Sequence, residues 1–81
     1  MPTILRYNGF RFCYYSNDHL LVHYHIFYQD GEIIIEIIDN VIEIREIRRM
    51  KINDAKKAIE ITENNIDFLI ESFNLYKLKN L

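Results

Sequence analysis

The chain has 81 residues, of which 49% are hydrophobic and 27% charged, and its formal net charge is −2 at pH 7. This composition excludes intrinsic disorder, and the length predicts one domain over residues 1–81. The acidic balance argues against general nucleic-acid binding, which needs basic residues to neutralise phosphates. The single cysteine, Cys13, excludes an internal disulfide and a Cys–His metal framework. We therefore expect no metal and no cofactor.

The sequence also indicates where the protein is located and how it assembles. The sequence contains no run of about 18 apolar residues, the length needed to cross a membrane. The start, Met1–Arg6, lacks the charged and apolar regions of a signal peptide. We expect a cytoplasmic protein. Because so short a chain buries little surface and has no disulfide or metal, we also expect a homodimer or a bound protein partner.

Turn signals divide the first half into five predicted strands between about residues 3 and 47. Asn8-Gly9 and Asp30-Gly31 suit two-residue hairpin turns, because Asn, Asp and Gly tolerate positive φ. Asp39-Asn40 is a weaker third turn, and Ser16–Asp18 is a polar break between the second and third strands. The expected sheet is an antiparallel meander.

These turns fix which residues oppose one another, and the opposed residues form an apolar core face. The expected pairs are Tyr7–Phe10, Leu5–Phe12, Tyr28–Ile33, Ile26–Ile35, Tyr24–Ile37, Ile37–Ile42 and Ile35–Ile44.

One long amphipathic helix is predicted over about residues 53–78, with Asn53 or Asp54 as its N-cap. Its apolar stripe repeats every three or four residues and includes Ala55, Ile59, Thr62, Ile66, Leu69, Phe73 and Tyr76. Such a helix would be about 39 Å long, whereas five strands span about 24 Å. It therefore either kinks near Asn64-Asn65 or extends past the sheet, where an apolar end would need a partner. The fold class is α+β, with the helix packed on one sheet face.

The other face of the sheet holds the candidate site. In the expected pairing, His25 opposes Glu36, Glu36 opposes Glu43, and Arg45 opposes Ile34. The candidate partner-binding residues are His23, His25, Phe27, Ile34, Glu36, Glu43 and Arg45.

Three interpretations of this face are open. It is a solvated face with cross-strand ion pairs, a binding face whose apolar side chains meet a partner, or a catalytic or metal site built on His23 and His25. The catalytic interpretation lacks a third ligand and a concave wall that would exclude water. We predict a partner-binding face with no catalytic residue.

Several segments resemble a known family of small bacterial proteins. Met1–Arg6, Gly9–Phe12 and Tyr15–Asp18 match its opening, and His23-Tyr24-His25 matches its His-x-His motif. The sequence resembles the domain of unknown function 4160 family, although Leu21-Val22 stands where that family has two prolines. The resemblance implies a strand-rich start, an acidic-Gly turn and a C-terminal helix that ends in aromatic residues.

The resemblance also implies an arrangement like that of toxin–antitoxin pairs, in which small partner genes lie next to each other. We expect a non-enzymatic regulatory module that binds a protein, either an inhibitor of a defence system of the anti-CRISPR kind or an antitoxin-type partner. The alternative is a toxin-like RNA-binding protein or ribonuclease that uses His23 or His25 as its base.

Overall fold

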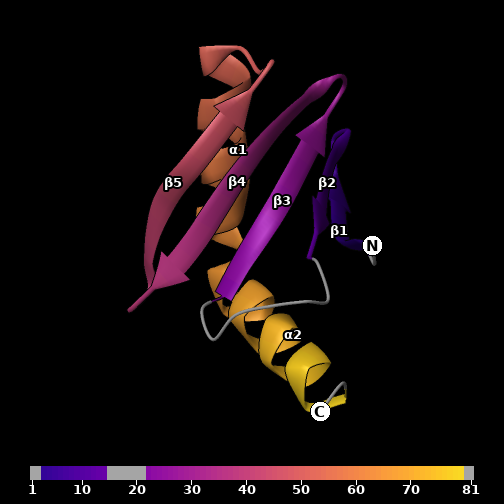
Figure 1. Ribbon diagram of the computed structural model, residues 1–81, viewed down its shortest axis with the longest axis vertical. Coiled ribbons are helices and arrows are strands. Elements are labelled where there is room, and N and C mark those ends of the chain that lie inside the picture. Colours follow the sequence, from indigo (N-terminus) through magenta and orange to yellow (C-terminus); the bar gives the residue numbers. More distant parts are fainter. Residues whose placement is uncertain (1–2, 15–21, 80–81) are drawn as a thin grey trace.

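The computed structural model describes residues 3–14 and 22–79. Its strands follow one another along the sheet in the order β1-β2-β3-β4-β5, with every neighbouring pair antiparallel. Both helices lie on one side of the sheet, and α2 continues past the end at which β3 begins (Figure 1). The α+β class and the meander are confirmed. The elements are β1 (Thr3–Tyr7), β2 (Phe10–Cys13), β3 (Val22–Tyr28), β4 (Gly31–Ile38), β5 (Val41–Arg48), α1 (Ile52–Asn64) and α2 (Ile66–Lys79).

Two of the predicted turns are confirmed. Asn8 and Gly9 have φ values of 48° and 87°, and Asp39 and Asn40 have values of 52° and 64°. Positive φ at both central residues is the geometry that gives a two-residue hairpin the twist of its strands. The pairs Tyr7–Phe10 and Leu5–Phe12 follow as expected.

The predicted turn between β3 and β4 was wrong by one residue. The turn is Gln29-Asp30, with Gln29 at φ 53°, and Gly31 is already the first residue of β4. Gly31 is needed for space, because a Cβ atom there would lie 2.7 Å from the backbone oxygen of Arg49. The chain that leaves β5 passes directly over Gly31, and this close approach, not a positive φ, explains the glycine.

The displaced turn shifts the β3–β4 register by two residues. Ile26 opposes Ile33 and Tyr24 opposes Ile35, in place of the expected Ile35 and Ile37. Side chains alternate between faces with a period of two, so a shift of two residues changes every partner and leaves every face unchanged. The predicted core face therefore survived an incorrect register.

A bulge interrupts the pairing of β4 with β5. Ile35 opposes Ile44 as expected, but Ile34 opposes Glu46, which leaves Arg45 as the extra residue. The expected pair of Arg45 with Ile34 was wrong for this reason. An extra residue bends the strand and increases its twist.

The core lies between the sheet and the two helices. Phe12, Tyr24, Ile26, Ile33 and Ile35 are fully buried from the sheet side. The helices bury Ala55, Ala58, Ile61, Thr62, Leu69 and Phe73 against them.

The Tyr24 hydroxyl donates a hydrogen bond of 2.6 Å to the backbone oxygen of Leu69, which ties β3 to α2. Burial raises the pKa of Tyr24 above its ordinary value, and the nearby Tyr14 raises it further.

The predicted single helix is divided at Asn65, one of the two outcomes that its length allowed. The Asn65 amide side chain donates to the Ile61 oxygen at 2.8 Å, and its backbone N–H donates to the Thr62 oxygen at 3.1 Å. Its own carbonyl accepts the first backbone hydrogen bond of α2, from Leu69 at 2.9 Å. Asn65 thus closes α1 and opens α2, and the direction of the chain changes there.

The start of α1 also differs from its prediction. The N-cap position is Lys51, in extended conformation and without a side-chain cap, so neither Asn53 nor Asp54 caps the helix. Asp54 lies in the first turn, where a carboxylate is favourable beside the positive end of the helix dipole.

Two more of the sequence-based expectations concern a polar break and a membrane span. The predicted break at Ser16–Asp18 lies outside the described residues. In residues 3–14 and 22–79, neither helix is long and apolar enough to cross a membrane.

Candidate functional site

The sheet face opposite the helices, hereafter the open face, carries three cross-strand rows of side chains. They follow directly from the observed register. The first row is Arg6, Arg11, Phe27, Glu32 and Arg48; the second is Thr3, Cys13, His25, Ile34 and Glu46; the third is His23, Glu36 and Glu43. All seven predicted site residues come from the strands β3, β4 and β5, and six of them stand in these rows while Arg45 occupies the bulge.

The two histidines are far less accessible than an open sheet face would make them. His23 is 6% exposed and His25 is 8% exposed. The His23 ring lies 5.9 Å from the ring of Phe73 in α2 and 5.8 Å from the His25 ring, measured between centroids. Both imidazoles are thus packed among neighbouring side chains. Phe27, Ile34 and Glu36 are half-buried, whereas Glu43 and Arg45 are exposed.

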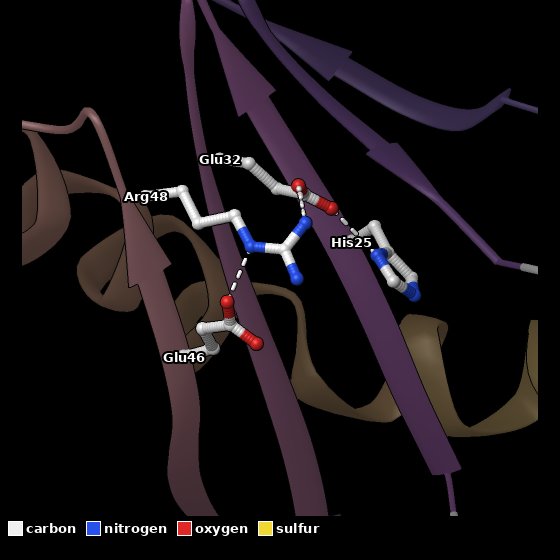
Figure 2. A network of polar contacts seen from close by, with 4 residues as sticks. All are labelled: His25, Glu32, Glu46 and Arg48. Atoms are coloured by element: carbon white, nitrogen blue, oxygen red, sulfur yellow. Dashed lines mark hydrogen bonds and ion pairs between the residues drawn. The ribbon is translucent and has the colours of Figure 1, made fainter.

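The carboxylate that contacts His25 is Glu32, not the predicted Glu36. His25 Nδ1 lies 2.7 Å from Glu32 Oε2, and the other oxygen of Glu32 lies 3.6 Å from Arg48 Nη1. Arg48 also donates a hydrogen bond to Glu46, which holds the pKa of Glu46 below its ordinary value. Figure 2 shows this chain of contacts, which runs from β3 across β4 to β5.

Sequence reasoning missed Glu32 because the turn was placed one residue late. With the turn at Gln29-Asp30, Glu32 opposes Phe27 and stands diagonal to His25. The signal that could have found it is the acidic residue directly after Gly31, on the same face as the histidines.

The third row is the acidic end of the open face. Glu36 opposes Glu43 as predicted, and like charges in directly opposed positions destabilise a sheet. Arg45 reaches Glu36 at 3.5 Å and offsets part of this repulsion. Within the part of the chain that the structure describes, Glu43 has no such cation.

The first row is the basic end. Arg6 and Arg11 oppose each other directly, and both side chains are exposed. The Arg11 guanidinium carbon lies 5.2 Å from the centroid of the Phe27 ring, a cation–π contact. A concavity of about 450 Å³ lies there, and its wall includes Gln29 and the Asn8-Gly9 turn.

Cys13 and the histidines do not assemble a reactive centre among the described residues. The Cys13 thiol is buried and lies 3.6 Å from the Thr3 hydroxyl. Nowhere in residues 3–14 and 22–79 do three side chains of His, Cys, Asp or Glu come together in a way that could hold a metal ion.

The edge strand β5 carries exposed aliphatic side chains on both faces of the sheet. Val41 is 56% exposed, Ile44 50% and Ile47 41%. Ile44 and Ile47 lie on the helix side of the sheet, but α1 does not cover them. Ile52, at the start of α1, is exposed beside this edge. A band of this kind is typical of an interface.

Comparison with known proteins assigns a family to the chain. No curated protein and no solved structure matches the chain. A family model described as Domain of unknown function (DUF4160) matches residues 9–74, which include β2 to β5, α1 and most of α2. The resemblance to this family is thereby confirmed over residues 9–74, and the chain belongs to the DUF4160 family.

Proposed function

We propose that this chain is a non-enzymatic, cytoplasmic protein-binding module that acts as a homodimer formed through β5. The observation that carries the proposal is the exposure of Ile44 and Ile47 on an edge strand, where their contact with water is unfavourable and no element in the described part of the chain covers them. A strand edge also offers unpaired backbone groups to a second strand. The second copy is the occupant that the charges of β5 favour.

The sequence of β5 is self-complementary in one antiparallel register. When Ile44 opposes Ile47 of the second copy, Glu43 opposes Arg48 and Arg45 opposes Glu46, and the two-fold axis repeats all three pairs. Glu43, which faces Glu36 within its own chain, thereby gains a cation. Opposite charges in such positions contribute about 0.2–1 kcal/mol each.

The bulge at Arg45 is compatible with this register. Bulges protect many sheet edges from pairing, because they displace one strand relative to its neighbour. Here the register places the two bulges side by side at the two-fold axis, so both copies are displaced equally. The result is a continuous ten-stranded sheet, twice the five strands of one chain.

Light scattering coupled to size exclusion tests the dimer. The wild-type chain at high micromolar concentration should have twice the mass of the monomer, and Ile44→Lys should be monomeric. Leu75→Lys is the matched control, since Leu75 in α2 is 52% exposed and Ile44 is 50% exposed. It should stay dimeric. A wild-type chain that remains monomeric would exclude the dimer.

Cysteine cross-linking tests the register. An equimolar mixture of Ile44→Cys and Ile47→Cys should form mixed disulfides, because their Cα atoms would lie within about 6 Å in opposed positions. Each variant alone should cross-link poorly, because identical positions would lie three residues apart along the strand, about 10 Å. Equal cross-linking in all three samples would contradict this register.

We propose the class of protein partner from the family resemblance. A module of this size, whose described residues assemble no reactive centre, suits an inhibitor of a defence system of the anti-CRISPR kind or the antitoxin-type member of a pair. If the wild type captures a protein partner and Ile44→Lys fails to capture it, the dimer is linked to partner binding.

The second candidate is a toxin-like RNA-binding protein or ribonuclease based on His23 and His25. The contact of Glu32 with His25 Nδ1 favours it, because a carboxylate on one ring nitrogen fixes the tautomer of the other. The burial of both rings opposes it. Incubation of purified protein with single-stranded RNA, with His25→Ala as the control, decides: cleavage that requires His25 would establish the ribonuclease.

A further inference from the structure

We infer that Arg6 and Arg11 form a carboxylate-binding site for an acidic segment of the partner protein. The inference rests on the proposed protein-binding function and adds to it a place and a chemistry. The site lies on the open face at the β1–β2 hairpin, at the opposite end of the sheet from the β5 edge.

Two features indicate an anionic ligand. The guanidinium groups occupy directly opposed positions on β1 and β2, an arrangement that repels in the absence of an anion. Within residues 3–14 and 22–79, no carboxylate lies within ion-pairing distance of either group, although every other cation in the rows of the open face has an acidic partner. Two neighbouring guanidiniums present planar donors that match the two oxygens of a carboxylate.

The surroundings of the pair are built to hold a side chain. Phe27 lies under the Arg11 guanidinium at 5.2 Å and limits the directions in which it can turn. The concavity of about 450 Å³ beside the pair adds an amide from Gln29 and the backbone of the Asn8-Gly9 turn. Such a site combines charge with an apolar wall, as interface arginines commonly do.

The distribution of charge favours a short acidic segment over a nucleic acid. A single nucleic-acid strand carries one phosphate about every 3.4 Å, so it needs a track of cations. The next row along the strands offers His25, which already contacts Glu32, and the row after it presents Glu36 and Glu43. A polyphosphate that begins at the arginine pair would therefore run into carboxylates, whereas one or two glutamate or aspartate side chains would not.

Titration followed by NMR tests the site. The probe is a blocked hexapeptide of alternating Glu and Ala, added to isotope-labelled full-length protein while the Nε–Hε signals of Arg6 and Arg11 are observed. These signals should shift and saturate, and the same peptide with Gln in place of Glu should have no effect. Arg6→Gln with Arg11→Gln should weaken binding about ten-fold or more, as expected for lost charge-assisted hydrogen bonds. Lys51→Gln with Lys56→Gln removes the same amount of positive charge from elsewhere and should bind like the wild type.

Four outcomes would overturn the inference. The first is the absence of shifts at Arg6 and Arg11, and the second is equal weakening by the lysine pair, which would show unspecific attraction. The third is tighter binding of inorganic phosphate or of an oligouridylate than of the Glu peptide, which would assign the site to phosphate. A protein partner that the arginine double variant still captures from solution would refute this site and leave the proposed function standing.

Discussion

His25 Nδ1 and Glu32 Oε2 lie 2.7 Å apart on the open face, with His25 only 8% exposed and the carboxylate shared with Arg48. The contact involves the second histidine of the His-x-His motif. It links β3 to β4 on the open face, whereas apolar packing links the two strands on the core face.

Replacement of Glu32 by Ala should lower the free energy of unfolding by about 1–3 kcal/mol, because the substitution removes the carboxylate that His25 contacts and one of the carboxylates near Arg48. Urea denaturation measures the change. Glu46→Ala is the control, since this exposed carboxylate also binds Arg48 and solvent screens its ion pair. We expect no measurable loss in the control; losses of equal size would show that the His25 contact contributes nothing.

Replacement of Tyr24 by Phe should cost about 1–2 kcal/mol, because the Leu69 oxygen in the core loses its hydroxyl donor. Thermal or urea unfolding of the variant measures this loss. Tyr7→Phe removes a hydroxyl from an exposed ring and should leave stability unchanged. Similar losses in both variants would contradict a specific role for the Tyr24 bond.

The same residue should govern stability at alkaline pH. Burial raises the folded-state pKa of Tyr24 above the ordinary value of 10.0. The stabilisation from its neutral form is therefore complete below about pH 10 and is lost as the pH rises above that value, where only the unfolded chain readily releases the proton. The free energy of unfolding of the wild type should fall above pH 10, and it should fall less steeply in Tyr24→Phe. Identical slopes in the two proteins would refute the assignment.

Gly31→Ala should destabilise the fold by about 2 kcal/mol or more, because the new Cβ would lie 2.7 Å from the Arg49 oxygen, a backbone atom that cannot turn away. Asp30→Ala, in the exposed turn beside it, should change stability by less than about 0.5 kcal/mol. Denaturant midpoints of the two variants give the comparison. If alanine is accepted equally well at both positions, the close approach does not constrain the chain.

Asn65→Ala should remove the side-chain bond to the Ile61 oxygen and lower stability by about 1 kcal/mol. The neighbouring Asn64 is exposed, and Asn64→Ala should be neutral or slightly stabilising because alanine has the higher helix propensity. Circular dichroism during thermal unfolding measures helicity and stability together. A more helical and equally stable Asn65→Ala would mean that the division between α1 and α2 is dispensable.

Local sequence patterns determined the secondary structure and the faces of this protein. Asn8-Gly9 and Asp39-Asn40 specify their turns through their own φ preferences, and neighbouring residues alone decide such preferences. The alternation of apolar residues on β3 and β4 assigned each side chain to its face, and that assignment tolerated a register error of two residues. The 3.6-residue period located the helical face that packs on the sheet.

The burial and the partners of individual side chains were decided by contacts between residues far apart in the chain. Position 31 is a glycine because the backbone at Arg49 passes over it, and no local preference encodes that approach. The His23 ring packs near Phe73, which lies fifty residues further along the chain. The sequence by itself therefore determined which residues of β3 and β4 share the open face, since side-chain alternation is a property of one strand, whereas the bulge at Arg45 placed Glu46 and Arg48 there. Only the tertiary structure decided which of them are accessible and which carboxylate each one meets, because packing and register are properties of several strands and a helix together.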